Sequence, residues 1–384
     1  MNDLGDHMKK PIKVLRVIGP FAAGGVENIT MNYFRSVDPS RVRFDFLFHG
    51  KKEISLEKEI EERGSHFFKV EHYRDNNVKS MIETYKIIKE NNYDIIHSHM
   101  NALSVFPLMA AKFAGAKIRI ASNHSTASKH EWKRSIVKFV LRPFSKLFAT
   151  HYVACSKHAA IWLFGEKAFK KGKVKLIKNA IELEKFRFSE TIRQETRKEI
   201  GCDEKFIIGH VGRFVRQKNH AFLIEVFEDV VKKNENAILV LIGDGPLKSG
   251  IEALVVEKGL SRYVKFLGLR EDVHRWMQAF DVFLLPSLYE GLGNVITEAQ
   301  AASTVSIISE GVPEEVKITE FVDQLSLSQS ISEWSEQILK YRIGYPRKDT
   351  INLMIDNGYE IRAASESLVD YYEELMEVVR KEKT

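Results

Sequence analysis

Four charged residues in the second half of the sequence are of the types that bind a nucleotide carrying a sugar. Arg213 and Lys218 share one segment, and Glu290 and Glu298 lie on either side of a turn that contains Gly293. Two fixed cations can hydrogen-bond and neutralise a diphosphate. A carboxylate can accept hydrogen bonds from two neighbouring sugar hydroxyls. Each residue alone could instead form an ion pair or lie on a solvated surface, but the combination of signs favours a nucleotide-sugar site.

The residues around the two carboxylates predict a strand, a turn and a helix in succession. The apolar run from Asp281 to Pro286 is typical of a buried strand, and residues 295–302 are typical of a helix. Glycines in the turn allow the backbone to approach a ligand closely. Free backbone N–H groups and the positive end of the helix dipole would point at one place. This pattern predicts a phosphate contact beside the carboxylates.

The first half of the sequence has its own candidates, and each follows a predicted strand. Gly24 and Gly25 come after the first strand, and His99 and His124 come after two later ones. Ligands of parallel sheets bind beyond the carboxyl ends of the strands, so these residues could face a substrate. A tight turn at the glycines, and histidines that bond their own backbone, are the alternatives.

Strands and helices alternate along the chain, which predicts parallel sheets with right-handed crossovers. A chain of 384 residues is long enough for two domains. The strand pattern restarts at residue 206, so the boundary is expected near residues 180–190. We predict an α/β protein with two Rossmann-like, doubly wound domains. The fingerprint G-x-G-x-x-G is missing after the first strand, which argues against NAD-dependent oxidoreduction.

The composition predicts a globular protein of the cytoplasm. Apolar residues make up 44% and charged residues 29% of the chain, and no apolar run approaches the ~20 residues of a membrane span. The first residues do not form a signal peptide. Cys155 and Cys202 are too few and too far apart for a disulfide framework or a metal site. The net charge of +6 is mild, and without a nucleic-acid-binding motif we expect no nucleic-acid partner.

Residues 129–148 are predicted to form a basic amphipathic helix, interrupted near Pro143. Lysines and arginines recur every three to four residues between aromatic and aliphatic ones. Such helices lie on anionic membranes or bind acidic partners. A helix that packs on the core and exposes its basic face to solvent is equally consistent with the pattern.

The motifs of the second half resemble those of the retaining glycosyltransferases of family four, which have the GT-B fold. Two acids separated by seven residues, as Glu290 and Glu298 are, form that family's signature. Four segments carry the resemblance: Gly212-Arg213 with Gln217-Lys218-Asn219, Gly243-Asp-Gly-Pro246, Phe266-Leu-Gly268, and Pro286-Ser-Leu-Tyr-Glu-Gly291 with Glu298-Ala. In outline the first half matches too, and the chain is most similar to glycosyltransferases of bacterial exopolysaccharide or capsule synthesis.

The resemblance implies catalytic and binding roles for the charged residues. Arg213 and Lys218 would hold the donor diphosphate and stabilise the leaving group. Glu298 would accept the ribose hydroxyls, Glu290 would contact the donor sugar, and His124 would lie near that sugar. Backbone N–H groups near Gly293 and Asn294 would bind sugar or phosphate, and the loop with Gly268 and Leu269 would lie by the nucleobase. Gly24 and Gly25 would approach the diphosphate from the other domain.

The resemblance also implies substrates and domain roles. A UDP-sugar would be the donor, a glycan or lipid-linked molecule the acceptor, and neither a cofactor nor a metal would be required. Residues 1–184 would form the acceptor-binding domain and residues 185–357 the donor-binding domain, facing each other across a cleft. A final helix, within 358–384, would complete the first domain. The enzyme would be cytoplasmic, at the inner face of the membrane if residues 129–148 bind lipid.

Three positions depart from the family pattern, and two other functions remain open. The family often has proline at Gly293 and glycine at Ala180 and Ser303. None of these changes removes a charged group, so we expect an active enzyme with an altered turn beside the donor sugar. A non-hydrolysing nucleotide-sugar epimerase would use a similar nucleotide site. A non-catalytic nucleotide- or sugar-binding module is the other alternative.

Overall fold

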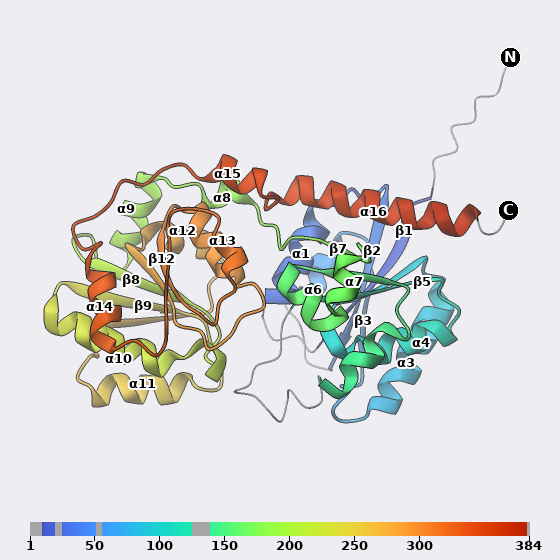
Figure 1. Ribbon diagram of the computed structural model, residues 1–384, viewed down its shortest axis with the longest axis horizontal. Coiled ribbons are helices and arrows are strands. Elements are labelled where there is room, and N and C mark those ends of the chain that lie inside the picture. The colour runs from blue at the N-terminus through green and yellow to red at the C-terminus, as the bar shows by residue number, and fades with distance from the viewer. Residues whose placement is uncertain (1–9, 20–24, 51–55, 125–138, 382–384) are drawn as a thin grey trace, which may run out of the picture. The chain divides into compact units, whose positions relative to one another are not determined.

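The computed structural model describes residues 10–19, 25–50, 56–124 and 139–381, which form two compact units (Figure 1). Unit 1 comprises Met1–Ala180 and Ile361–Thr384, and unit 2 comprises Ile181–Glu360. The chain therefore leaves unit 1 once, forms unit 2, and returns. None of the helices in the described ranges is long and apolar enough to cross a membrane.

The described part of unit 1 forms a seven-stranded parallel sheet in the order β3-β2-β1-β4-β5-β6-β7. Its strands are apolar over most of their length, as expected where helices cover both faces. The strand order reverses between β1 and β4, and this is the switch point where doubly wound sheets bind ligands. The strands are β1 Ile12–Ile18, β2 Val42–His49, β3 Phe67–Val70, β4 Ile95–Ser98, β5 Ile118–Asn123, β6 His151–Ala154 and β7 Val174–Leu176.

Helices flank this sheet, and the last helix of the chain belongs to its core. The buried residues of α16 (Ile361–Lys381), among them Leu368 and Tyr372, pack in one cluster with residues of β1 and β2. On the outer face of α16, Arg41 forms ion pairs with the carboxylates of Glu366, Asp370 and Glu373. The other elements are α1 Gly25–Ser36, α2 Glu57–Glu62, α3 Asn77–Asn91, η1 Asn101–Ser104, α4 Val105–Phe113, η3 Arg142–Lys146, α6 Lys157–Phe164 and α7 Glu166–Lys170.

The described residues of unit 2 form a six-stranded parallel sheet in the order β10-β9-β8-β11-β12-β13. Its strand order reverses between β8 and β11, which places a second switch point there. The strands are β8 Phe206–Val211, β9 Ala237–Ile242, β10 Val264–Gly268, β11 Val282–Leu285, β12 Val305–Ser309 and β13 Val322–Leu325.

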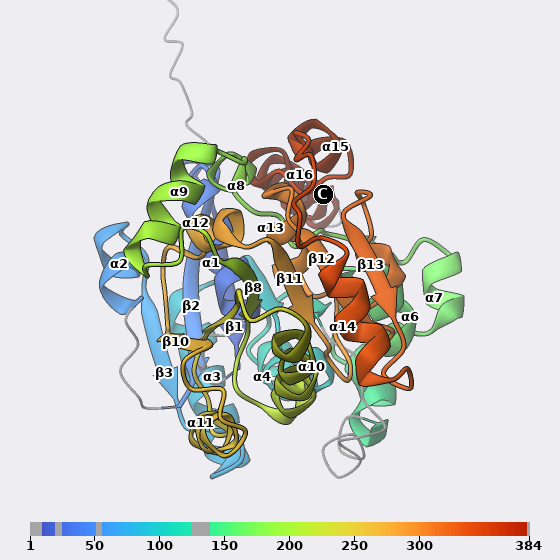
Figure 2. The ribbon, with the colours of Figure 1, turned by 90° about the vertical axis from the view of Figure 1, so that its left-hand side faces the viewer.

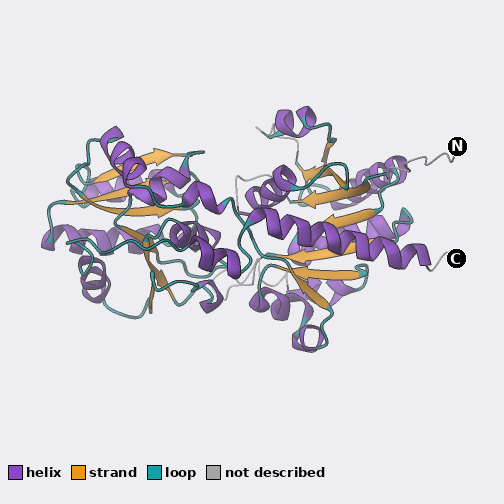
Figure 3. Ribbon diagram, turned by 90° about the horizontal axis from the view of Figure 1, so that it is seen from above, coloured by secondary structure: helices purple, strands orange, loops and turns teal. Residues whose placement is uncertain are grey.

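Helices cover both faces of this sheet (Figures 2 and 3). Two apolar clusters, one on each face, hold unit 2 together. Alternate residues of β9 point to opposite faces, so Leu239 and Leu241 join one cluster and Ile238 and Val240 the other. The elements around the sheet are α8 Leu183–Phe186, α9 Glu190–Glu199, η4 Arg216–Lys218, α10 His220–Lys233, α11 Lys248–Glu257, α12 Val273–Ala279, α13 Asn294–Ala301, η5 Glu314–Val316, α14 Ile331–Leu339 and α15 Ile351–Asp356.

The predicted fold class, two doubly wound parallel sheets, is confirmed. The strand predicted at residues 117–121 extends to Asn123, because Asn123 still pairs with β6. The final helix begins at Ile361 and not at Gly358, whose φ of +80° is a left-handed conformation. Residues 129–138 of the predicted basic helix at 129–148 lie outside the described residues. Gly24 of the first loop lies outside them too. Residues 142–146 form the 3-10 helix η3.

Candidate functional site

Glu290 is the centre of a hydrogen-bond network beyond the carboxyl ends of β8 and β11. Its side chain is only 8% exposed. Oε1 accepts hydrogen bonds from Lys218 Nζ at 2.7 Å and from Ser287 Oγ at 2.7 Å. Oε2 accepts one from Gln217 Nε2 at 3.1 Å. The carboxylate is therefore held in one orientation, with the charge of Lys218 beside it.

Backbone hydrogen bonds hold the loop of Lys218 against the loop of Glu290. The amide of Leu288 donates to Gln217 O at 2.8 Å, and Gln217 Nε2 donates to Tyr289 O at 2.9 Å. Gly212 allows the Lys218 side chain to pass over the end of β8, since an added Cβ would lie 3.3 Å from its methylene carbons. The same Cβ would lie 2.9 Å from His210 Nε2. A side chain at position 212 would therefore displace Lys218.

A third loop, after β12, fixes the turn from the other side. The amide of Glu290 donates to Gly311 O at 2.8 Å. A Cβ at Gly311 would lie 2.5 Å from Ser287 O and 2.6 Å from Leu288 O. This separation is too short for any side chain, so the glycine allows the two loops to meet.

Gly293 begins helix α13 in a conformation that proline cannot adopt. Its φ is +81° and its ψ is +59°, in the left-handed region. The proline ring fixes φ near −65°. A proline at this position could therefore not adopt the conformation of this turn. Asn294, the first residue of α13, lies at the end where helical N–H groups lack acceptors within the helix.

Glu298 lies on the second turn of α13 and is partly buried. Burial raises the pKa of its carboxyl to about 7, and the nearby charge of Lys218 opposes this shift. In the described residues no side chain forms a hydrogen bond or ion pair with this carboxylate. Glu298 is thus close enough to Lys218 to sense its charge, yet it does not share the network of Glu290.

Arg213 and the loop after β10 present groups to solvent at the same edge of the sheet. Arg213 follows β8 and is exposed, and no carboxylate in the described ranges pairs with it. Gly268 ends β10 with a φ of +67°, and its carbonyl accepts from Gly243 N at 2.7 Å. Leu269 next to it is largely exposed. The predicted residues of the second half thus all lie at the carboxyl edge of this sheet.

In unit 1, three histidines surround a small cavity at the ends of β4 and β5. His99 Nδ1 and His124 Nε2 are 2.9 Å apart, and Arg16 Nε donates to His99 Nε2 at 3.2 Å. Burial and the charge of Arg16, opposed by the Asn179 side chain, together lower the pKa of His124 to about 4. The cavity holds about 20 Å³, enough for one water molecule. Gly25 begins α1 in the same unit.

Several site residues were not found from the sequence. Arg16 lies in the middle of an apolar run, and Ser287 and Gln217 look like ordinary loop residues. A signal for Arg16 exists, because alternate residues of a strand share one face. Ile12, Val14 and Ile18 of β1 are buried in one cluster, and Arg16 lies in that row.

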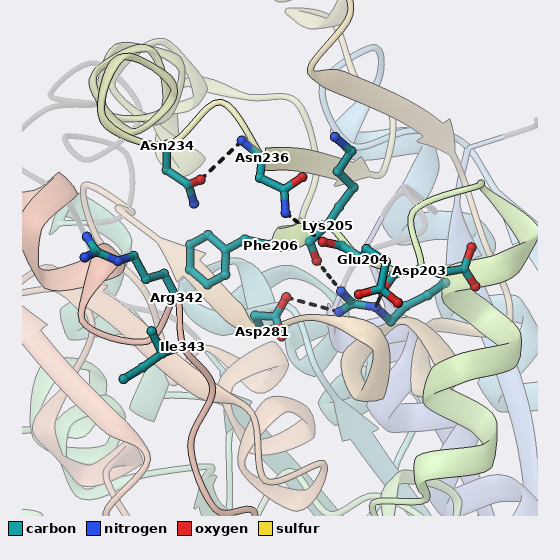
Figure 4. A pocket seen from close by; sticks show the side chains of 10 residues that line it. Asp203, Glu204, Lys205, Phe206, Asn234, Asn236, Asp281, Arg342 and Ile343 are labelled. Carbon is teal, nitrogen blue, oxygen red and sulfur yellow. Dashed lines mark hydrogen bonds and ion pairs between the residues drawn. The ribbon is translucent and has the colours of Figure 1, made fainter.

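A second cavity in unit 2, of about 380 Å³, lies at the opposite edge of the sheet (Figure 4). Its charged pair of Arg197 and Asp281 serves the fold. Asp281 accepts from Arg197 Nη1 at 3.1 Å and from the amide of Ile207 at 2.7 Å. Ligands of such sheets bind at the carboxyl edge, so we do not assign it to the site. The lining residues are Arg197, Asp203, Glu204, Lys205, Phe206, Asn234, Asn236, Asp281, Arg342 and Ile343.

The two halves of the chain match two glycosyltransferase families. Residues 23–185 match the family described as Glycosyltransferase Family 4. Residues 205–341 match the family described as Glycosyl transferases group 1. Over the described residues, no group of three or more histidines, cysteines or acids could hold a metal ion.

Individual proteins resemble the chain over most of its length. A protein of Bacillus subtilis named as the glycosyltransferase EpsF is 34% identical over 368 residues, which cover 94% of this chain and 96% of EpsF. The UDP-Gal:α-D-GlcNAc-diphosphoundecaprenol α-1,3-galactosyltransferase of Escherichia coli is 29% identical over 60% of this chain and 62% of its own length. The structure of Anabaena HepE in complex with UDP-glucose matches with a TM-score of 0.77 at 17% identity, covering 94% of this chain and 100% of HepE.

Proposed function

This chain belongs to the family-four glycosyltransferases and has the GT-B fold, and we propose that it transfers a sugar from a UDP-sugar to a glycan or lipid-linked acceptor during the synthesis of a cell-surface polysaccharide. The observation that carries the proposal is the Lys218–Glu290 pair beside Glu298 at the carboxyl edge of the unit 2 sheet. A cation and two carboxylates suit a molecule that carries both phosphates and hydroxyls. Support for UDP comes from HepE, which shares the fold and was determined with UDP-glucose.

Each charged residue has a proposed task in the reaction. Arg213 and Lys218 neutralise the diphosphate as the bond to the sugar breaks, and Glu298 accepts hydrogen bonds from the ribose hydroxyls. Glu290 and His124 contact the donor sugar, and backbone N–H groups near Gly293 and Asn294 bind sugar or phosphate. The loop with Gly268 and Leu269 contacts the nucleobase, and the glycine pair Gly24 and Gly25 serves the diphosphate. Because two cations supply the positive charge, we expect the reaction to need no metal.

We propose that the configuration at the transferred carbon is retained. The nucleoside diphosphate leaves with the bonding electron pair, and the acceptor hydroxyl attacks from the face that it leaves. A phosphate oxygen of the departing group takes the proton of that hydroxyl. The products are the glycosylated acceptor and UDP, so atoms and charge balance without a further reactant. Identification of the anomer in the product by NMR tests this step.

A lipid-linked acceptor is supported by a relative and by the surface of unit 1. The Escherichia coli relative is named for an undecaprenol-diphosphate acceptor. Phe139, Val140, Phe144 and Leu147 are exposed apolar residues of the predicted basic segment, and Lys146 is exposed among them. Apolar side chains interleaved with cations suit an anionic lipid surface. We therefore propose that the enzyme is cytoplasmic and works at the inner face of the membrane.

A liposome assay tests the membrane contact separately from catalysis. Exchange of Phe144 and Leu147 for serine should weaken cosedimentation with vesicles that contain anionic lipid. Exchange of the exposed Val256 and Ile343 of unit 2 is the matched control, because it removes apolar surface elsewhere. Equal vesicle binding by the wild type, the Phe144 and Leu147 variant and the control variant would contradict the membrane proposal.

A thermal-shift screen of nucleotide-sugars tests the central proposal. A ligand in excess of its Kd raises the unfolding temperature, and we expect this for a UDP-sugar. Replacement of Lys218 by alanine should abolish the shift, whereas replacement of the exposed Lys232 should preserve it. If no UDP-, GDP- or ADP-sugar stabilises the protein, the proposed function is wrong. Conversion of a UDP-sugar to its epimer without acceptor would instead favour the epimerase alternative.

A further inference from the structure

Arg16 is a buried cation with no carboxylate partner among the described residues. It is 2% exposed. Its Nε donates to His99 Nε2 at 3.2 Å, and its Nη1 lies 3.5 Å from Thr30 O. Its guanidinium also lies over the ring of Phe44, 4.7 Å from the centroid. Burying a charge without an ion pair is costly, so the residue needs an explanation other than stability.

The hydrogen bond from Arg16 fixes the position of the proton on His99. A guanidinium has only donors and stays charged, so His99 Nε2 must accept. A neutral imidazole that accepts at Nε2 carries its proton at Nδ1. His99 Nδ1 therefore donates to His124 Nε2 across the 2.9 Å between them.

The proton on His124 is fixed in the same way. Its Nε2 accepts from His99, so its proton lies on Nδ1, a buried nitrogen beside the side chain of Asn179. His97 lines the same cavity as Arg16, His99 and His124. His97 bonds Tyr372 Oη and Ser122 Oγ, each at 2.6 Å, and thus stands outside this series.

We propose that Arg16 and His99 are positioning residues that keep His124 neutral with its proton at Nδ1, so that His124 can only donate a hydrogen bond there, to Asn179 or to a substrate oxygen that takes its place, and does not act as a base. The part of this inference that concerns the substrate rests on the proposed function. The part that concerns the proton positions rests on geometry alone. A donor suits the hydroxyl oxygen of a sugar, and it suits equally an oxygen that gains negative charge.

The electrostatic environment agrees with this direction. Burial, and after it the charges of His97, Arg16 and His124, lower the pKa of His99 well below the ordinary range. The pKa of His124 is lowered to about 4, by burial and then by Arg16. Protonation of His124 at Nε2 would bring two N–H groups face to face. Among the residues that line the cavity there is no carboxylate to offset a second positive charge.

Two pairs of variants separate the direction of the hydrogen bonds from packing. In His99→Gln the amide oxygen can accept from Arg16 and the amide nitrogen can donate to His124, whereas His99→Leu can do neither. Arg16→Lys keeps a group that only donates, whereas Arg16→Met removes it. Tyr372→Phe is the control, because it removes a hydroxyl that bonds His97, outside the series. Thermal unfolding identifies any variant that fails to fold.

The readout is the tautomer of His124 in protein with ¹⁵N-labelled histidine at neutral pH, with the signal assigned by its loss in His124→Gln. We expect the proton at Nδ1 in the wild type, His99→Gln, Arg16→Lys and Tyr372→Phe. His99→Leu and Arg16→Met should show a mixture of tautomers, with kcat/KM lowered on the order of tenfold. A wild-type proton at Nε2, or an unchanged tautomer in His99→Leu and Arg16→Met, overturns the inference.

This experiment distinguishes the inference from the proposed function. The tautomer is measured without any nucleotide-sugar. The expected tautomers in a protein that binds no nucleotide-sugar would confirm the positioning by Arg16 and His99 and would contradict the proposed function. Nucleotide-sugar binding by a protein whose His124 carries its proton at Nε2 would support the proposed function and contradict the positioning by Arg16 and His99.

Discussion

Lys218 and Glu290 form an ion pair that a bound diphosphate must share. The pair is 2.7 Å apart, and the side chains are 14% and 8% exposed. A phosphate group that approaches Lys218 meets a cation whose position Glu290 already fixes. This arrangement reduces the loss of side-chain entropy when the diphosphate binds. It also means that each residue of the pair depends on the other for its charge to be compensated.

Removal of one partner should cost more stability than removal of both charges. Lys218→Met leaves a buried carboxylate unpaired and should lower the free energy of unfolding by about 3 kcal/mol. Lys218→Met combined with Glu290→Gln should recover most of that loss. Both proteins should lose on the order of 10²–10³ in turnover, since the contact to the diphosphate is gone in both. Urea unfolding and initial rates measure these effects, and recovery of activity in the double variant would contradict the diphosphate contact.

The raised pKa of Glu298 predicts that donor affinity depends on pH. With a pKa of about 7, the carboxyl is mostly neutral at pH 6 and mostly ionised at pH 8. The ionised form accepts hydroxyl hydrogen bonds more strongly, so UDP-sugar affinity should rise by up to about tenfold over this interval. Calorimetric titration at several pH values measures it. In Glu298→Gln the dependence should disappear, and its persistence would assign the titration to another group.

The same shift has a consequence of opposite sign for the fold. The folded pKa lies above the ordinary value of 4.5, so the folded protein binds the proton more tightly than the unfolded chain. This residue therefore lowers stability as pH rises from 4.5 towards 7, whereas affinity rises over pH 6 to 8. Glu298 is thus a residue that favours ligand binding over stability.

Among the elements, the turn into α13 shows most directly how backbone conformation limits the sequence. Gly293→Pro forces φ from +81° to near −65° and should lower the free energy of unfolding by about 3 kcal/mol or more. Binding of the UDP-sugar should be lost with it. Gly293→Asn is the matched control, because asparagine tolerates the left-handed region. The nearest atom to an added Cβ, 3.4 Å away on Val312, does not prevent it. A stable Gly293→Pro protein would show that the turn can adopt another conformation.

Most elements could be predicted from the sequence because their signals are local. Buried parallel strands have continuous apolar runs, as in residues 237–242, and helices such as α16 show the helical period over many residues. The positions of Arg213, Lys218, Glu290 and Glu298 at one edge followed from the rule for parallel sheets. That rule needs only the order of strands and loops in the chain.

The parts that could not be predicted depend on contacts between distant residues. The 2.7 Å contact between Lys218 and Glu290 joins residues 72 positions apart, and no local pattern encodes it. The contact between Arg16 and His99 joins residues 83 positions apart. A basic residue in a strand looks like an error in the apolar pattern until its partner is known. The altered turn expected at Gly293 is likewise defined only by the structure, in which a φ of +81° sets the start of α13.

At the scale of the whole molecule, unit 2 is a continuous segment and unit 1 is not. Residues 181–360 should therefore fold as an isolated fragment, with a cooperative thermal transition in circular dichroism. Residues 1–180 alone should not, because α16 supplies buried core residues such as Leu368 and Tyr372. Addition of a peptide of residues 361–381 should restore structure to that fragment. A cooperative transition in 1–180 alone would show that the sheet is stable without α16.

The return of the chain to unit 1 affects the order of events during synthesis on the ribosome. Between residue 180 and the end of α16 at Lys381 about 200 residues are added, which takes about 10–40 s at the usual rates of translation. Throughout this interval the apolar face of unit 1 that α16 will cover is open to other nascent chains and to chaperones. Unit 2 can complete its folding in the meantime. The domain that is made first is thus the last to be finished.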